Sequence, residues 1–205
     1  METIVLSAFS EGSIESALHA LRAGQLVAFP TDTVYGLGAL AFVSDAVQSI
    51  FRAKSRPPEK AIPILLGRAE DLSLVARDVP EMAWRLGARF WPGPLTIITT
   101  KNPNVPAAVS STATVAVRVP DHAAALALLR AAGPMAVTSA NLSGQADPTT
   151  AGDVLAQLGG RISIILDGGE TPGGIPSTIV DCLHGEPEIV RAGPLSLEVL
   201  KAALA

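Results

Sequence analysis

The sequence contains one cysteine and three histidines among its 205 residues. The single Cys182 cannot form an internal disulfide, and the scattered His19, His122 and His184 offer no zinc-ligand spacing. We therefore expect no protein-held metal. The chain also lacks H-E-x-x-H and G-x-S-x-G, which removes the common metalloprotease and serine-hydrolase templates.

The sequence has no long apolar run and no excess of basic residues. The longest uncharged stretches, 102–117 and 131–146, contain proline or glycine and many hydroxyl groups, so neither is expected to span a membrane. Glu2 precedes the first short apolar run and no basic residue does, which is atypical of a secretory signal and predicts a cytoplasmic protein. The net charge of −4 means that any contact with tRNA or double-stranded RNA should be local and weak.

The composition is that of a compact globular chain. Apolar residues make up 48% and charged residues 17%, with 18 glycines and 16 prolines, which excludes disorder, coiled coil and collagen. At about 100 to 200 residues per domain, the length predicts a single domain over residues 1–205.

Strand-like and helix-like segments alternate along the chain, which predicts an α/β fold. The segment 31–38 is interpreted as a loop between a strand and a helix. Ser13, Ser44, Asp121 and Thr150 are the expected N-caps of four helices. The expected helices cover 13–23, a segment beginning at 44, 80–90, 121–132, 150–158 and 196–204. The expected strands cover 25–29, 61–66, 95–100, 115–119, 135–138, 162–166, 178–180 and 189–190.

Five polar clusters lie at the ends of the expected elements, where open α/β sheets usually bind ligands. They are 30–38, 54–60, Arg118, 138–144, and 176–178 together with 191–193. Each of them taken alone also fits an ordinary polar turn or a solvated charged loop. The familiar phosphate motifs are absent, because no G-x-x-x-x-G-K-[ST] occurs and Gly36 and Gly38 lack a third glycine.

The basic side chains give the clearest indication of an anion-binding site. Lys54, Arg56 and Lys60 are expected on one connection between a helix and a strand, and this mixture of point charges and a planar fork suits a polyanion such as a triphosphate. Arg118 lies opposite three valines on its expected strand and therefore needs a partner or water.

Several ordered blocks together strongly resemble the YrdC/Sua5 family of threonylcarbamoyl-AMP synthases. The blocks are Pro30-Thr-Asp-Thr-Val-Tyr-Gly-Leu-Gly38, Lys54-Ser-Arg-Pro57, Phe90-Trp-Pro-Gly-Pro-Leu-Thr96, Val117-Arg-Val-Pro120, Ser139-Ala-Asn-Leu-Ser-Gly144, Ser177-Thr-Ile-Val-Asp181 and Arg191-Ala-Gly193. The match runs over nearly the whole chain and resembles the short bacterial form without the additional domain of Sua5.

The resemblance implies a three-layer α/β fold around a twisted, mixed sheet with a concave, positively charged cavity. It implies an enzyme, a nucleotidyltransferase that makes threonylcarbamoyl-AMP and pyrophosphate from L-threonine, bicarbonate or CO2, and ATP. Other proteins then transfer the threonylcarbamoyl group to an adenosine of tRNA, the t6A modification.

The resemblance also implies roles for individual residues. Lys54 and Arg56 would be the catalytic cations at the phosphates. L-threonine would be held by Thr33, Arg118 and Ser177, with Arg118 on its carboxylate. ATP would be bound by Arg56, Lys60, Thr114, Ser139, Asn141, Asp147 and Arg191, and Mg²⁺ would arrive with ATP rather than in a protein cage.

Some positions depart from the family pattern or leave two interpretations open. Longer members have histidine near Leu65 and serine at Asp147, which places direct contacts there in doubt, whereas Ser55 replaces a glycine without removing either flanking cation. Tyr35 either lines the pocket or wedges its loop against the core, and we favour the wedge.

Two other functions remain compatible with the sequence. A protein of the same fold could bind RNA as a maturation or translation factor without making the adenylate. The intact Ser139–Asn141 block and the small number of aromatic residues for base stacking count against it. A carbamoyl-transferring domain such as that of hydrogenase maturation proteins is the second, but those domains occur within much larger chains.

Overall fold

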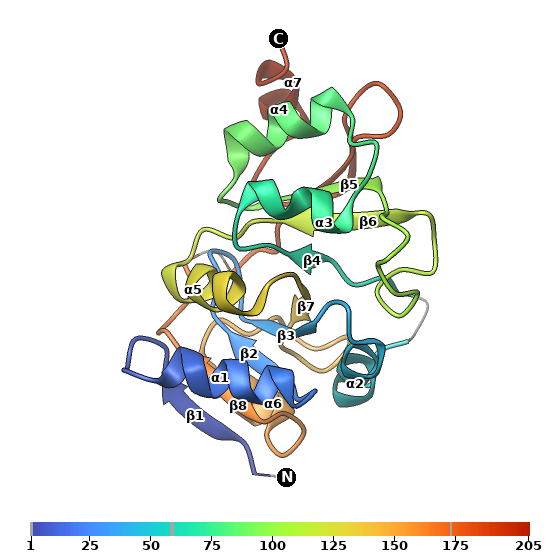
Figure 1. Ribbon diagram of the computed structural model, residues 1–205. Helices are drawn as coiled ribbons and strands as arrows, with labels where there is room; N and C mark the ends of the chain where they lie inside the picture. Colours follow the sequence, from blue (N-terminus) through green and yellow to red (C-terminus); the bar gives the residue numbers. More distant parts are fainter. Residues whose placement is uncertain (1, 58–59, 173) are drawn as a thin grey trace.

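A mixed sheet of ten strands organises the chain in the computed structural model, which describes residues 2–57, 60–172 and 174–205. In sequence order the strands are β1 (Ile4–Ser7), β2 (Val27–Phe29), β3 (Gly36–Leu40), β4 (Ile64–Leu65), β5 (Leu95–Thr100), β6 (Thr114–Arg118), β7 (Met135–Ser139), β8 (Ile164–Asp167), β9 (Thr178–Asp181) and β10 (Glu188–Arg191). Their order across the sheet is β1-β8-β2-β3-β7-β4-β6-β5-β9-β10, with both parallel and antiparallel neighbours. The sheet runs from the N-terminal end of the molecule to the C-terminal end (Figure 1).

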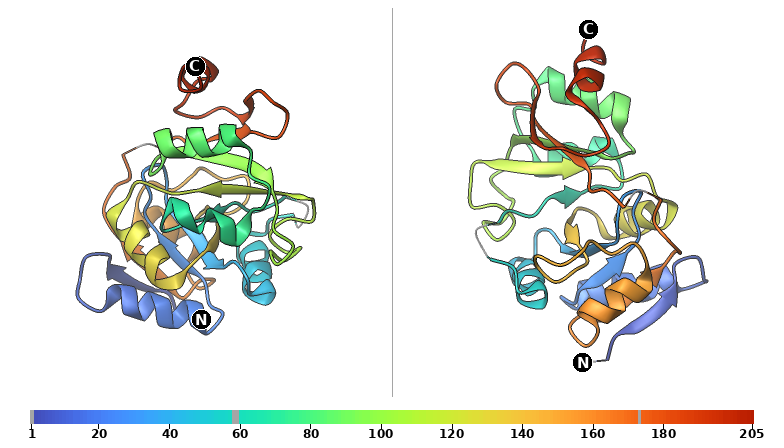
Figure 2. Two further views of the ribbon diagram at one scale, coloured as in Figure 1. Left: turned by 45° about the horizontal axis from the view of Figure 1, so that its top comes forward. Right: turned by 180° about the vertical axis from the view of Figure 1, so that it is seen from behind.

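Helices cover both faces of this sheet. They are α1 (Ser13–Arg22), α2 (Ser44–Lys54), the short η1 (Ala69–Asp71), α3 (Leu72–Val75), α4 (Glu81–Phe90), α5 (Ala123–Ala132), α6 (Ala151–Leu158) and α7 (Leu197–Ala202). Helices α1 and α5 lie in front of β2 and β3, whereas α6 comes forward when the molecule is seen from behind (Figures 1 and 2).

The alternation of side chains along the strands explains these layers. Ile64 and its cross-strand neighbour Ala136 belong to the core cluster beneath α2, α3 and α6, whereas Leu65 and Met135 belong to the cluster beneath α1 and α5. Because successive residues of a strand point to opposite faces, these apolar runs are buried on both sides. A third cluster joins β5 and β9 to α4 and α7.

The expectation for residues 31–38 was partly wrong, because β3 begins at Gly36 and pairs with both β2 and β7. Gly36 and Gly38 have no apolar side chains, so the alternation of apolar residues did not predict this strand. Their small size serves close packing inside the sheet: a Cβ at Gly36 would lie 2.7 Å from Cγ1 of Val137, and one at Gly38 would lie 2.7 Å from Cε of Met135.

Other expectations differ from the structure at element boundaries. The strand β1 and the helical turns at 69–75 were not expected, and β4 is shorter than the predicted strand over 61–66. The expected N-cap at Thr150 is confirmed, because its side chain accepts from the Asp153 amide and Asp153 reciprocates. The other three caps were wrong, since Gly12, Val43 and His122 occupy those N-cap positions and make no side-chain cap.

Among the described residues, no helix combines the length and the apolar character needed to cross a bilayer.

Candidate active site

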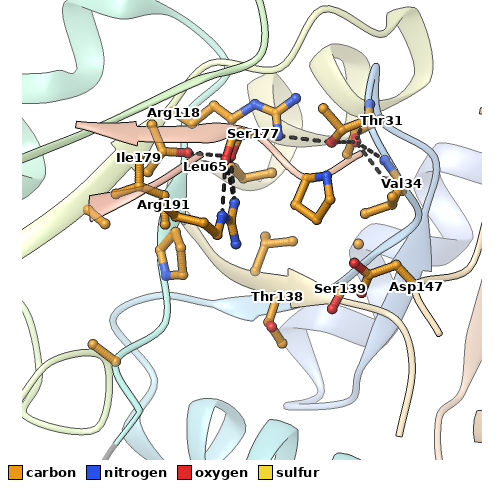
Figure 3. Close-up of a pocket in the computed structure, with 18 of the residues that line it drawn as sticks. Thr31, Val34, Leu65, Arg118, Thr138, Ser139, Asp147, Ser177, Ile179 and Arg191 are labelled. Atoms are coloured by element: carbon orange, nitrogen blue, oxygen red, sulfur yellow. Dashed lines mark hydrogen bonds between the residues drawn. The ribbon is translucent and has the colours of Figure 1, made fainter. Parts of the chain in front are cut away.

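A pocket of about 370 Å³ lies beside α1 and α5 on the same face of the sheet, since its lining residues Leu65 and Val137 belong to the core cluster beneath these helices. Seven neighbouring strands, from β3 through β7, β4, β6, β5 and β9 to β10, each contribute lining residues. The described lining includes three arginines, Arg56, Arg118 and Arg191, and one carboxylate, Asp147. Figure 3 shows Arg118, Ser177 and Arg191 gathered on one side, with Ser139 and Asp147 on the other.

Arg118 is fixed at one end of the pocket although only 5% of it is exposed. Its Nε donates to the carbonyl of Gly93 at 2.9 Å, its Nη1 donates to Oγ1 of Thr33 at 3.0 Å, and its Nη2 pairs with the carboxylate of Asp32. Burial lowers the pKa of Arg118, and the Asp32 charge opposes that shift. The expectation that this arginine needs a partner is confirmed. Its remaining N–H groups are available to a ligand.

Local turns place the three partners of Arg118. Thr31 forms a hydroxyl turn in which Oγ1 donates to the carbonyl of Val34 and accepts from the amide of Thr33. The Trp91 indole donates to the carbonyl of Leu95 at 2.7 Å and closes the loop that presents Gly93. The Phe90–Thr96 block therefore acts on the pocket by holding a backbone carbonyl.

Ser177 and Arg191 form the adjoining wall. Arg191 donates from Nε and Nη2 to the carbonyl of Ser177 and from Nη2 to its hydroxyl, which also bonds Oγ1 of Thr96 at 2.8 Å. A β-bulge lies between Ile189 and Arg191, and bulges redirect side chains beside sites. A Cβ at Gly193 would lie 2.3 Å from the amide of Thr178, so only glycine allows this close approach.

Lys54 lies at the last position of α2 and is 2% exposed, so the expectation that it lies on a loop was wrong. Its ammonium donates to the carbonyl of Ser139, the carbonyl of Asn141 at 2.6 Å and Oδ1 of Asn141 at 2.9 Å. An ammonium has three N–H donors, so none remains for a ligand in this arrangement. Burial, followed by the nearby Arg56 charge, lowers the pKa of Lys54 to about 8.

Arg56 differs from Lys54 because its side chain lines the pocket. Its Nη2 donates to the carbonyl of Ala61 at 3.1 Å, while its buried Nε has no hydrogen-bond partner within the described part of the chain. Burial lowers its pKa. A buried donor without a partner is costly in a folded protein, which makes Arg56 a candidate ligand contact.

The other expected site residues divide into two groups. Thr33, Ser139, Asp147, Ser177 and Arg191 line the pocket together, and so does Leu65, one of the positions that depart from the family pattern. The structure does not place Lys60, Thr114 or Asn141 in the lining: Lys60 is exposed, Thr114 bonds Thr112, and Asn141 is buried behind Ser139.

Tyr35 is in the core and not in the pocket, as favoured from the sequence. Its hydroxyl donates to the carbonyl of Gly169 at 2.7 Å, and burial raises its pKa to about 12. Sequence reasoning missed Asp32 and Thr96 as parts of the site. The only available signal was their position inside two of the quoted blocks, because their roles depend on contacts with residues far along the chain.

Within the described ranges no three His, Cys, Asp or Glu side chains cluster in a way that could hold a metal ion. Asp147 is the one carboxylate among the described lining residues. This donor set suits a cation that brings most of its own ligands, because Mg²⁺ commonly keeps several waters and phosphate oxygens.

The fold and the site define an α/β protein whose mixed sheet carries a polar pocket lined by three arginines. The Sua5/YciO/YrdC family model, described as "Telomere recombination", matches residues 19–193. The chain belongs to this family.

Curated relatives agree with this assignment. The chain is 43% identical to the threonylcarbamoyl-AMP synthase of Pyrococcus abyssi, covering 95% of this chain and 58% of that protein. It is 42% identical to the Bacillus subtilis threonylcarbamoyl-AMP synthase, with 95% and 57% covered. A putative threonylcarbamoyl-AMP synthase of Mycobacterium tuberculosis is 40% identical, with 93% and 88% covered. The chain thus spans a little over half the length of the first two.

Solved structures show the same fold. P. abyssi Sua5 complexed with L-threonine matches with a TM-score of 0.95 at 42% identity, covering 98% of this chain and 61% of that one. E. coli YciO matches with a TM-score of 0.84 at 27% identity, covering 97% and 98%. The expected twisted, mixed α/β fold is confirmed.

Proposed function

We propose that this chain makes threonylcarbamoyl-AMP. In the proposed reaction the amine of L-threonine takes up bicarbonate or CO2 to form a carbamate, whose oxygen attacks the α-phosphorus of ATP. The bond from that phosphorus to the β-phosphate bridge oxygen breaks and pyrophosphate leaves, so the enzyme is a nucleotidyltransferase. Water balances the reaction when bicarbonate is the carbon source.

The observation that carries this proposal is a pocket whose two ends suit two different substrates. At one end, Arg118 is immobilised by three partners and has N–H groups to spare, which suits the carboxylate of an amino acid. Thr33 and Ser177 add hydroxyl groups at the same end. The relative described in complex with L-threonine supports assigning this end to threonine.

The opposite end suits the nucleotide. Arg56 offers a buried Nε that has no partner among the described residues, and Ser139 offers a hydroxyl. Arg191 adds a second guanidinium from the wall that it shares with Ser177. We propose that these groups meet the phosphates and sugar of ATP. Asn141 and Lys54 would act on the nucleotide through Ser139 rather than by contact, since they bond to it from behind. Lys60 and Thr114 lie outside the described lining, so the proposal assigns them no contact with ATP.

The chemistry requires positioning and charge neutralisation more than a strong nucleophile. Among the described lining residues there is no histidine, cysteine or lysine, whereas three arginines can offset the charges of a carbamate and a triphosphate. Bringing two anions together in one pocket replaces an unfavourable encounter in water with a fixed geometry.

Magnesium would enter with ATP, and Asp147, the one carboxylate in the described lining, would contact it directly or through water. The ion would supply charge neutralisation at the phosphates. We further propose that the product passes to proteins that transfer the threonylcarbamoyl group to tRNA.

The test is pyrophosphate release from the purified chain with Mg-ATP, with and without L-threonine and bicarbonate, followed by mass analysis for threonylcarbamoyl-AMP. We expect release to depend on both additions. Binding of ATP with no adenylate under any combination would overturn the proposal for this chain.

A further inference from the structure

The turn that connects Ser139 to Asp147 is held from two sides. Lys54 binds it from α2, through the contacts with Ser139 and Asn141 given above. From α6, the side-chain amide of Gln157 spans the other part of the turn. Its Oε1 accepts from the amide of Leu142 at 3.0 Å, and its Nε2 donates to the carbonyl of Ala146 at 3.1 Å.

Both anchor points of Gln157 adjoin groups of the site. Leu142 directly follows Asn141, which accepts the Ser139 hydroxyl at 2.6 Å, and Ala146 directly precedes Asp147. Because the backbone passes a shift at one residue to the next, the single amide of Gln157 restrains polar groups that it does not touch. Gln157 itself is half-buried and does not line the pocket.

The other end of the pocket has side-chain supports of its own. Arg118 depends on Asp32, Thr33 and Gly93, and none of these residues makes a hydrogen bond to the 139–147 turn within the described part of the chain. The loop that carries Asp32 and Thr33 meets the turn through its backbone, where the carbonyl of Tyr35 accepts from the amide of Ala140 at 2.8 Å. Because Gln157 holds the turn at residues 142 and 146, beyond that bond, loosening its hold should disturb the Ser139–Asp147 side more than the Arg118 side.

We propose that Gln157 is a positioning residue that sets the affinity of the pocket for the nucleotide. This inference rests on the proposed function, which assigns ATP to the Ser139–Asp147 side. Gln157 fixes the turn from α6 with its side-chain amide. The oxygen of that amide accepts from residue 142, and its nitrogen donates to residue 146.

The experiment compares Gln157→Met, which keeps side-chain length and removes both hydrogen bonds, with Gln48→Met on the exposed side of α2. Loss of hydrogen bonds worth about 1 kcal/mol predicts that Gln157→Met raises the Kd and the KM for ATP about fivefold. The KM for L-threonine should stay within about twofold, and amide exchange in a peptide covering 139–147 should become faster. Gln48→Met should change none of these.

Faster exchange with an unchanged Kd for ATP would overturn the inference, and so would an equal rise in both KM values, which indicates a general loss of structure. If the unsubstituted protein binds ATP but makes no adenylate, the proposed function fails while calorimetric ATP binding and exchange still decide the role of Gln157. If it binds no ATP, both proposals fail.

Discussion

The two ends of the pocket use arginine in different ways. Arg118 is held by protein partners on three sides, so its position is set before any ligand arrives. Arg56 has one protein acceptor, the carbonyl of Ala61, and a buried Nε without a partner among the described residues. A guanidinium that is already fixed in place, like that of Arg118, suits a small rigid carboxylate. A guanidinium with fewer protein partners, like that of Arg56, can adjust to a larger and more flexible polyphosphate.

A second contrast separates Arg56 from Lys54, two positions away. The two cations were expected to act together on phosphates. In the structure Lys54 faces inward and organises the 139–147 turn, while Arg56 lines the pocket. The difference teaches that two charges in one short motif can have different surroundings, because one bonds to buried carbonyls and the other lines the pocket.

The largest effect is expected from Arg56→Met. On the proposed function Arg56 donates to the phosphates of ATP, so its removal should lower kcat about 100-fold or more. The KM for L-threonine should be nearly unchanged, and the free energy of unfolding should fall by less than about 1 kcal/mol because the residue is only half-buried. Steady-state kinetics and urea unfolding check both statements. Activity close to that of the unsubstituted protein would remove Arg56 from the site.

For Lys54→Met we expect the main effect on stability rather than on a direct contact with ATP. Three oxygen acceptors lose their buried donor, so we expect the free energy of unfolding to fall by about 3 kcal/mol. Chemical unfolding of the Arg56→Met and Lys54→Met proteins side by side provides the measurement. Equal stability of the two would contradict the assigned structural role.

Asp32→Asn tests the Arg118 end of the pocket. The amide retains an oxygen for the Asp121 backbone but loses the charge that fixes Arg118, so the KM for L-threonine should rise about tenfold with little change for ATP. Asp121→Asn, an equal change on the exposed neighbouring residue, is the control. A rise in the KM for ATP alone would show that Arg118 does not serve threonine.

The last prediction concerns the dependence of stability on pH. The pKa of Lys54 is lowered from 10.5 to about 8, so between these values the unfolded chain binds more protons than the folded one. Stability relative to Lys54→Met should therefore rise as pH increases above about 8 and level off near 10.5. Taking the difference between the two proteins cancels the shared contributions of Tyr35 and Cys182, whose raised pKa values act in the opposite direction. A flat difference would show that burial does not perturb this lysine.

Prediction from sequence succeeded where local patterns dominate. The helices around Leu21 and Leu86, the N-cap at Thr150 and the alternating strand at Val117 are all present. It failed for β3, because glycines carry no apolar signal although neighbouring side chains need their space. It also failed for the setting of Lys54, because a short basic motif does not reveal which cation finds buried carbonyls.

The sequence by itself determined the alternating elements, the absence of thiol and imidazole clusters, and the blocks that indicate the family, because these depend on residue type and spacing. Only the tertiary structure decided that Asp32 fixes Arg118, that Lys54 turns away from the pocket and that Gln157 spans the 139–147 turn. Those contacts join residues 11 to 87 positions apart, and the sheet and its covering helices bring them together by pairings that no local pattern encodes.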